Sequence, residues 1–161
     1  MDRKERKTGF QGERRFLSNF FPSPVHLEGE AYPTVEHAFQ AAKTLDPAWR
    51  ERIRQAPTPQ EARRLGRLVP LRPGWEEMRV AVMEALLRQK FADPSLRRKL
   101  LQVPEEELVE WNTWHDTFWG RCTCTRCGGR GQNHLGILLR EIRREALKED
   151  ASLKGTDLEA P

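Results

Sequence analysis

The sequence predicts a helix-rich α+β protein: a single domain with a small β-sheet. Its 161 residues are enough for one domain with its own hydrophobic core. Several segments place apolar residues at the spacing of an amphipathic helix, whereas only short segments alternate between apolar and polar residues. No apolar run approaches the ~18 residues that a membrane-spanning helix needs, so we expect no membrane partner.

The first half of the chain is predicted to form a hairpin and three short helices. Residues 25–32 alternate between apolar and polar side chains around Gly29, which indicates a β-hairpin. Thr34 is a suitable N-cap for a helix that runs to about Thr44. Two further short helices are expected at residues 47–56 and 59–68.

The second half is predicted to hold the longest helices. The helix at about residues 74–91 has these residues at helical spacing: Met78, Val82, Ala85, Leu86 and Gln89. A short helix at residues 94–103 and a short strand at residues 107–112 follow. The closing helix at residues 133–148 has one apolar face: Leu135, Leu138, Leu139 and Ile142. The domain thus covers residues 9–148, between a flexible basic N-terminus (1–8) and a disordered tail (149–161).

Charge and cysteine content narrow the class of protein. The net charge of +4 suits either a solvated surface or attraction to a polyanion or a phosphorylated small molecule. The N-terminus lacks the apolar stretch of a signal peptide, from which we expect a cytoplasmic location. The three cysteines are clustered and odd in number, which argues against a disulfide framework. The oligomeric state is left open by these features.

The predicted helix after Thr34 carries a stripe of polar residues. Glu36, Gln40 and Lys43 lie within about 60° of one another at about 100° per residue. A carboxylate in the first turn is stabilised by the helix macrodipole. The stripe is either an exposed polar face or a catalytic arrangement of an acid, an amide and an amine. His37 lies off the stripe, and we expect it to be buried and hydrogen-bonded rather than catalytic.

Two other segments could bind parts of a ligand. Asn19 lies inside an aromatic cluster with Phe20 and Phe21, which suits either a self-capping turn or a rigid loop that presents flat rings. Arg67 and Arg72 follow a predicted helix, where they form either surface charge or a phosphate clamp.

All three cysteines lie in one short segment. Cys122, Cys124 and Cys127 form a Cys-x-Cys-x-x-Cys pattern, and His134 or His115 supplies a fourth ligand. Such a set suits a structural zinc, with His134 as the first choice, although the spacing is not that of a standard zinc finger. Just before it, Asp116 and Trp119 combine a carboxylate with a ring that can stack on a heterocycle.

Five segments in register resemble a known family. They read FLSNFFPSP, YPTVEHAFQAAK, GRLVPLRPGW, NTWHDTFWG and GQNHLGILLREIR. In this order they are similar to the NADAR family, and in particular to its bacterial YbiA-like members, along nearly all of residues 9–147. The cysteine-containing segment at residues 121–131 looks like an insert that is found in a subset of members.

The resemblance implies an N-glycosidase. YbiA-like members cleave the C1–N bond of phosphorylated ribosylamino-pyrimidine intermediates of riboflavin biosynthesis and release ribose 5-phosphate. Other members resemble ADP-ribosyl glycohydrolases that remove ADP-ribose from guanine bases of nucleic acid, which is the first alternative. A zinc-stabilised nucleic-acid-binding module is the second alternative.

The resemblance also implies roles for the residues above. Glu36, Lys43 and Asp116 become the catalytic candidates. The following become substrate-binding candidates: Asn19, Phe20, Phe21, Gln40, Arg67, Arg72, Trp119 and Asn133. Two mechanisms are open: a carboxylate that stabilises an oxocarbenium-like state and activates water, or attack of Lys43 on C1 to form a Schiff base. We favour Lys43 as the nucleophile, and neither mechanism needs a cofactor.

Overall fold

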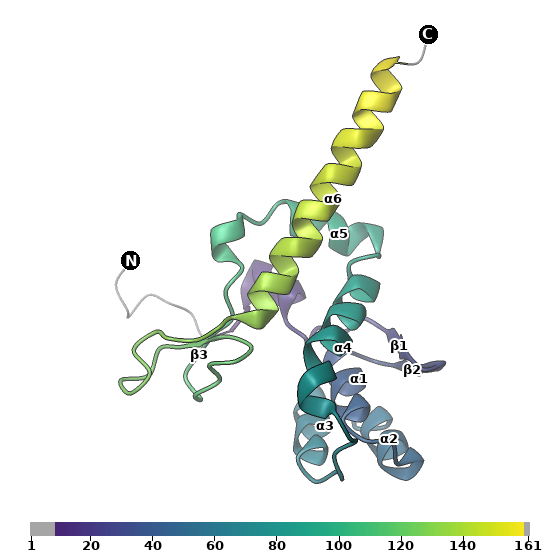
Figure 1. The fold of residues 1–161 in the computed structure, drawn as a ribbon, viewed down its shortest axis with the longest axis vertical. Helices are drawn as coiled ribbons and strands as arrows, with labels where there is room; N and C mark the ends of the chain where they lie inside the picture. Colours follow the sequence, from purple (N-terminus) through teal and green to yellow (C-terminus); the bar gives the residue numbers. More distant parts are fainter. Residues whose placement is uncertain (1–8, 160–161) are drawn as a thin grey trace. The chain divides into compact units, whose positions relative to one another are not determined.

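The structure is a computed structural model that describes residues 9–159, and the predicted flexible N-terminus at residues 1–8 lies outside the described residues. The chain forms two compact units. One comprises Glu13–Ala92, and the described residues of the other are 9–12 and 93–159 (Figure 1). The prediction of a helix-rich α+β fold is confirmed, but the strands form two two-stranded sheets instead of one.

The unit Glu13–Ala92 begins inside a short 3-10 helix, η2 (Gly12–Leu17), which is followed by the predicted hairpin. Strands β1 (Val25–Leu27) and β2 (Glu30–Tyr32) pair antiparallel, with Leu27 opposite Glu30. The two loop residues, Glu28 and Gly29, both have positive φ. This backbone geometry matches the twist of the strands in tight two-residue hairpins.

Helix α1 (Val35–Ala42) forms the centre of this unit. Every one of its residues is buried, and it contacts the hairpin and helices α2 (Pro47–Arg54), α3 (Pro59–Gly66) and α4 (Trp75–Lys90). The Thr34 hydroxyl accepts from the backbone amide of His37, which confirms the predicted N-cap. His37 Nε2 lies 3.0 Å from the carbonyl oxygen of Ala56, to which it donates, so this ring is structural, as expected.

The buried face of α4 differs from the pattern predicted for it. Of the five residues at the predicted spacing, only Leu86 is buried. The other buried residues of α4 are Trp75, Met83, Leu87 and Lys90. The apolar residues of α4 cover much of its circumference, so periodicity alone does not select the face that packs on α1.

The second unit contains α5 (Pro94–Leu101), the 3-10 turn η3 (Glu105–Glu107) and two strands of two residues each. Strands β3 (Trp111–Asn112) and β4 (Arg121–Cys122) pair parallel. The predicted strand at residues 107–112 is thus reduced to its last two residues. The chain turns after Pro104 into η3, and Leu108 has non-extended ψ, which prevents strand geometry there.

The last helix, α6 (His134–Glu159), buries its predicted apolar face and packs against α5 (Figure 1). The helix continues past Lys148 to Glu159, so it ends later than the sequence predicted. Arg97 Nη2 explains part of this extension, because it forms ion pairs with Glu149 (3.3 Å) and Asp150 (2.8 Å). Among the described residues, no helix is both long and apolar enough to cross a membrane.

Candidate active site

The carboxylate of Glu36 lies in the buried core of the unit Glu13–Ala92. Glu36 is only 4% exposed, and its Oε1 accepts from Gln40 Nε2 at 2.8 Å and from Arg63 Nε at 3.1 Å. It lies in the first turn of α1, where the macrodipole favours a negative charge. The two residues at the start of the polar stripe therefore do not form an exposed polar face.

Gln40 is held against α3. A Cβ atom at Gly66 would collide with the Gln40 side chain, so glycine permits this close approach of α3 to α1. Gln40 Nε2 is used by Glu36, whereas Gln40 Oε1 is buried without a hydrogen-bond partner among the described residues. A buried acceptor of this kind is ready for a donor from a ligand.

Lys43 follows at the C-cap of α1 and is half-buried. Burial lowers the pKa of the Lys43 ammonium below its ordinary value, because desolvation penalises the charged form. The positive charges of Arg63 and Arg67 lower the pKa of Lys43 further, while Glu36 opposes the shift. The polar stripe therefore combines a buried carboxylate with an amine that loses its proton more readily than an exposed lysine.

The loop Ser18–Phe21 is anchored to α1. The carbonyl oxygen of Asn19 accepts from the backbone amide of Glu36 at 3.1 Å, at the N-terminal end of the helix. Ser18 Oγ accepts from the amide of Phe20, so the segment forms the self-capping turn. Presentation of its rings to a ligand stays a prediction. Asn19 Oδ1 is a second buried acceptor without a described partner.

Cations lie against the two aromatic rings of this loop. The guanidinium of Arg63 lies 4.6 Å from the centroid of the Phe20 ring. The Phe21 ring has Lys90 Nζ at 5.7 Å and the Arg15 guanidinium at 5.9 Å. Arg63 therefore contacts both Glu36 and Phe20. Local sequence patterns do not point to this residue, because Glu36 is 27 positions away.

Lys90 is a second functional candidate that was not predicted from the sequence. It is 1% exposed, and its Nζ donates to the carbonyl oxygen of Ser18 at 2.7 Å. Burial lowers the pKa of Lys90 to about 7. Lys90 lies at i+3 and i+4 from the buried Leu87 and Leu86, and a lysine on an apolar face was the signal that could have found it.

The two arginines predicted as a phosphate clamp differ in their surroundings. The backbone amide of Arg72 donates to the carbonyl oxygen of Lys43 at 2.8 Å, and Arg72 Nη1 lies 3.5 Å from the carbonyl oxygen of Ala42. Arg72 also pairs with Glu28 at 3.8 Å. Arg67 is exposed at the C-cap of α3. Arg72 thus caps α1, and Arg67 is the arginine better presented to an anion.

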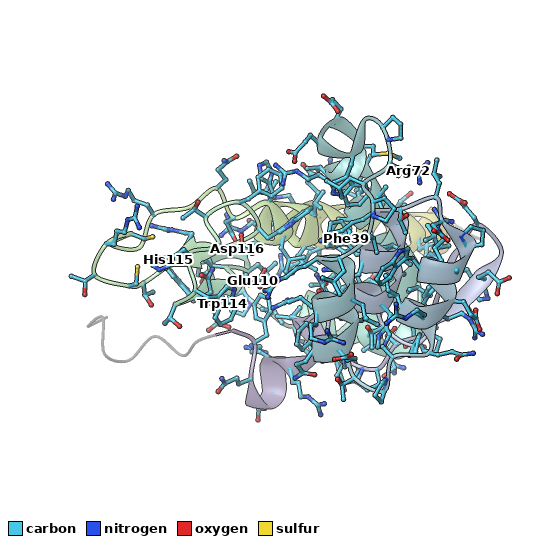
Figure 2. All side chains as sticks on the ribbon, turned by 90° about the horizontal axis from the view of Figure 1, so that it is seen from below. Phe39, Arg72, Glu110, Trp114, His115 and Asp116 are labelled. Atoms are coloured by element: carbon cyan, nitrogen blue, oxygen red, sulfur yellow. The ribbon has the colours of Figure 1, made fainter. Side chains whose placement is uncertain are left out.

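In the second unit, Asp116 shapes the loop between β3 and β4 (Figure 2). Its Oδ1 accepts from the backbone amides of Phe118 at 3.1 Å and Trp119 at 2.9 Å. The side chain of Asn112 bonds both the amide and the carbonyl group of Asp116. The Trp119 ring packs edge-on against Phe118, with ring centroids 4.9 Å apart. One carboxylate oxygen of Asp116 is therefore occupied by the backbone.

Asn133 has a structural position just before α6. Its Oδ1 accepts from the amide of Glu110 at 3.0 Å, and its Nδ2 donates to the carbonyl oxygen of Leu108 at 3.1 Å. Asn133 also has a positive φ of 54°, a conformation that asparagine tolerates better than most residues. Both polar groups of the amide thus bond the segment that precedes β3, which indicates a positioning role.

The family model described as the NADAR domain matches residues 6–147. The chain belongs to this family. The match covers most of the chain, so the resemblance carried by the five sequence segments is confirmed.

Relatives of this NADAR chain include N-glycosidase YbiA of Escherichia coli (strain K12), which is 42% identical over 132 residues, or 80% of this chain and 79% of that protein. The NMR structure of the E. coli protein YbiA matches with a TM-score of 0.70 and 34% identity over 90% of this chain and 85% of that chain. Riboflavin biosynthesis protein VVA0006 of Vibrio vulnificus (strain YJ016) is 35% identical over 139 residues, 84% of this chain but 36% of that protein. The predicted class, an N-glycosyl hydrolase, is confirmed by these matches.

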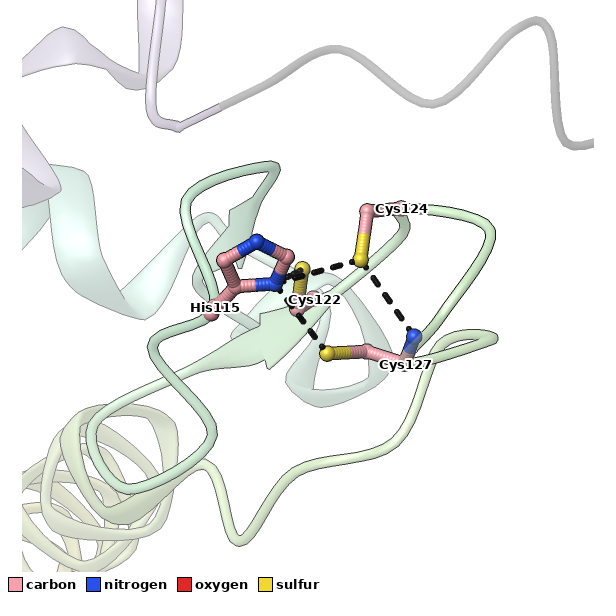
Figure 3. Close-up of side chains that lie close together, drawn as sticks. All are labelled: His115, Cys122, Cys124 and Cys127. Atoms are coloured by element: carbon pink, nitrogen blue, oxygen red, sulfur yellow. Dashed lines mark hydrogen bonds between the residues drawn. The ribbon is translucent and has the colours of Figure 1, made fainter.

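The NADAR chain also has a cluster of side chains that could hold a metal ion. His115, Cys122, Cys124 and Cys127 bring their ligand atoms within 4.8 Å of one another (Figure 3). His134, the first choice from the sequence, is not in this cluster. Its Nε2 lies 2.8 Å from Gln132 Oε1, and its ring packs on Phe118 because His134 is already the first residue of α6.

Proposed function

We propose that this NADAR chain hydrolyses the C1–N bond of phosphorylated ribosylamino-pyrimidine intermediates of riboflavin biosynthesis and releases ribose 5-phosphate. One observation carries the proposal: α1 combines the buried Glu36 carboxylate with Lys43, whose pKa is lowered by burial. The names of the relatives, N-glycosidase and riboflavin biosynthesis protein, support the reaction and the substrate class.

Lys43 is the nucleophile in the mechanism that we favour. Ribosylamines open to a form in which C1 is double-bonded to the amine nitrogen of the pyrimidine. The neutral amine of Lys43 adds to C1, a proton moves to the pyrimidine nitrogen, and the aminopyrimidine leaves. Lys43 is then joined to C1 as a Schiff base. Water adds to C1, and collapse of the adduct releases ribose 5-phosphate and restores the amine.

Glu36 fits the role of proton carrier in this sequence. Its carboxylate lies on the same helix face as Lys43 and interacts with the charge of the Lys43 ammonium. Hydrogen bonds from Gln40 and Arg63 hold the carboxylate in place. In the alternative mechanism, Glu36 or Asp116 stabilises an oxocarbenium-like state and activates water. Because two backbone amides already bond Asp116 Oδ1, Glu36 is the better candidate for either task.

The remaining candidates have binding roles in the proposal. Phe20 and Phe21 supply flat surfaces for the pyrimidine, and Arg67, with Arg72, binds the phosphate. Trp119, in the second unit, stays a candidate predicted from the sequence. Asn19 and Gln40 each have an unpartnered buried oxygen that can accept from ribose hydroxyls or ring amines. Catalysis needs no cofactor here, and a metal bound by the His115 cluster would have a structural role.

Removal of ADP-ribose from guanine bases is the second candidate function. It also breaks a C1–N bond of a phosphate-bearing ribose, and the net charge of +4 suits a nucleic-acid substrate. A nucleic-acid-binding module without catalysis fits less well, because charge attraction gives no reason to bury Glu36 and Gln40. A steep salt dependence of DNA binding would favour these alternatives.

The test is release of ribose 5-phosphate from a ribosylamino-pyrimidine 5′-phosphate. We expect turnover by the wild type, and a loss of at least ~100-fold in Lys43→Ala and Glu36→Gln, the lower end for removing a proton-transfer group. Lys148→Ala, at an exposed position of α6, is the matched control and should retain activity. A wild type that does not cleave the ribosylamino-pyrimidine 5′-phosphate but does cleave an ADP-ribosylated guanine base would contradict the proposed substrate. That result would favour the second candidate function.

A further inference from the structure

We propose that His115 Nδ1 and the sulfur atoms of Cys122, Cys124 and Cys127 bind one structural Zn²⁺ ion. This site is separate from the proposed reaction and does not depend on it. None of the names of the relatives refers to a metal. The inference rests on the positions of four ligand atoms and on the backbone that holds them.

The distances match the edges of a zinc tetrahedron. His115 Nδ1 lies 4.0 Å from Cys122 Sγ, 3.3 Å from Cys124 Sγ and 3.5 Å from Cys127 Sγ (Figure 3). With Zn–S bonds of about 2.3 Å and Zn–N bonds of about 2.0 Å, tetrahedral geometry places nitrogen and sulfur about 3.5 Å apart. One imidazole nitrogen at this distance from three sulfurs leaves space for an ion between them.

The backbone of the cysteine segment is folded around the sulfurs. The amide of Cys127 donates to Cys124 Sγ at 3.3 Å, and the amide of Gly128 donates to the carbonyl oxygen of Cys124 at 2.8 Å. The amide of Gly129 then returns to the carbonyl oxygen of Cys122 at 2.7 Å. Gly128 and Gly129 have φ of 64° and 88°, which glycine adopts without strain. The turn thus directs all three thiols to one side.

The histidine comes from a different segment. His115 lies on the loop between β3 and β4 and has a φ of 68°, which is uncommon for a non-glycine residue. Such backbone conformations persist where surrounding interactions require them, and a metal–ligand bond is one such interaction. Coordination by His115 therefore gives a physical reason for a conformation that the loop sequence alone does not favour.

The chemistry of the ligands selects both the ion and its role. Thiolates and imidazole prefer Zn²⁺, whereas Mg²⁺ and Ca²⁺ prefer oxygen ligands. Four protein ligands fill a tetrahedral site and leave no open position for water or substrate, which is typical of structural zinc. The described cysteines are free, so no disulfide competes for these sulfurs.

The position of His115 suggests what the ion stabilises. His115 is followed directly by Asp116, which bonds the amides of Phe118 and Trp119. Cys122 lies in β4, where it pairs with Asn112 of β3. The ion would thus join the loop that carries Asp116 and Trp119 to β4 and to the turn at residues 124–129. Loss of the ion should loosen this loop and leave the unit Glu13–Ala92 intact.

Metal content tests the proposal directly. Full-length protein, purified without an affinity tag or chelator, should contain one zinc per chain by elemental analysis. The double variant Cys124→Ser/Cys127→Ser and the variant His115→Ala should lose zinc, while His134→Ala is the matched control and should retain it. Zinc retained by His115→Ala and lost by His134→Ala would overturn the ligand set, and wild type without zinc after incubation with excess Zn²⁺ would overturn the site.

Co²⁺ substitution keeps the test decisive if the variants fold poorly. Wild-type protein reconstituted with Co²⁺ should show the intense absorption bands of tetrahedral cobalt and the charge-transfer bands of thiolate ligands. Weak octahedral bands without thiolate charge transfer would contradict the proposal. Chelation of the zinc form should lower the melting temperature, because an ion that binds only the folded state stabilises it. An unchanged melting temperature after the zinc is removed would contradict the structural role.

Discussion

The polar stripe of α1 and the loop between β3 and β4 position their candidate side chains in different ways. In α1, helix geometry brings Glu36 and Gln40 into contact four residues apart, at 2.8 Å. In the loop, Asp116 and His115 are placed by the backbone bonds of a tight turn and by cysteines seven to twelve residues away. The comparison shows that a regular helix fixes relative positions locally, whereas an irregular loop needs bonds from several segments.

Replacing the carboxylates of Glu36 and Asp116 by amides gives the sharpest test of the difference between the helix and the loop. Glu36→Gln should lose at least ~100-fold in kcat/KM, because it removes a proton-transfer group and keeps the shape of the side chain. Asp116→Asn retains Oδ1 as the acceptor of the Phe118 and Trp119 amides, so its loss should be much smaller. Steady-state kinetics of both variants measures the two losses in kcat/KM. A larger loss in Asp116→Asn would make Asp116 the main catalytic carboxylate.

Lys90 combines both cases, because its buried amine lies on helix α4 and donates to the carbonyl oxygen of Ser18 in a loop. Its pKa of about 7 in the folded protein is below its unfolded value of about 10.5. The unfolded chain therefore binds more protons between pH 7 and 10, so the free energy of unfolding should rise with pH in this window. From pH 7 to 9 the rise should reach about 2 kcal/mol relative to Lys90→Met.

Denaturant unfolding of the wild type and Lys90→Met at several pH values measures that difference. The Ser18 carbonyl oxygen and the rings of Phe21 and Phe91 stabilise the ammonium and act in the opposite direction. Parallel pH dependence in the two proteins would show that these contacts keep Lys90 charged in the fold.

The variant Asn133→Ala tests how much the Asn133 side chain stabilises the segment before β3. Asn133→Ala leaves the amide of Glu110 and the carbonyl group of Leu108 without their partners, at a cost of about 1–3 kcal/mol. Chemical denaturation should show this loss of stability, and the kcat of the remaining folded protein should change little. Unchanged stability with a raised KM would instead support the substrate contact that the sequence predicted.

The variant Arg67→Gln tests how a neighbouring positive charge changes the pKa of Lys43. Its positive charge lowers the pKa of Lys43, so Arg67→Gln should raise that pKa and move the rising limb of the pH–rate profile to higher pH. We expect a displacement of less than about one pH unit, because Arg67 is exposed and solvent screens its charge. Arg67→Lys keeps the charge and should keep the wild-type profile.

Local patterns in the sequence were enough to predict the hairpin, the short helices and the apolar face of α6. They also placed Glu36, Gln40 and Lys43 on one stripe, because these relations depend on helix periodicity. The patterns did not identify Arg63 or Lys90, whose partners are 27 and 72 positions away. They also favoured His134 over His115 as the fourth ligand, which is wrong, because the choice depends on the conformation of a turn.

Trapping of the covalent intermediate tests the central claim, that Lys43 is the nucleophile of the reaction. A Schiff base between Lys43 and C1 is reduced by borohydride to a stable secondary amine. Mass spectrometry of peptides from protein that is turning over substrate should then find ribose 5-phosphate attached to Lys43. The adduct should be absent from Lys43→Ala and present in the control Lys148→Ala. Full turnover by Lys43→Ala, with no adduct on the wild type, would contradict the claim.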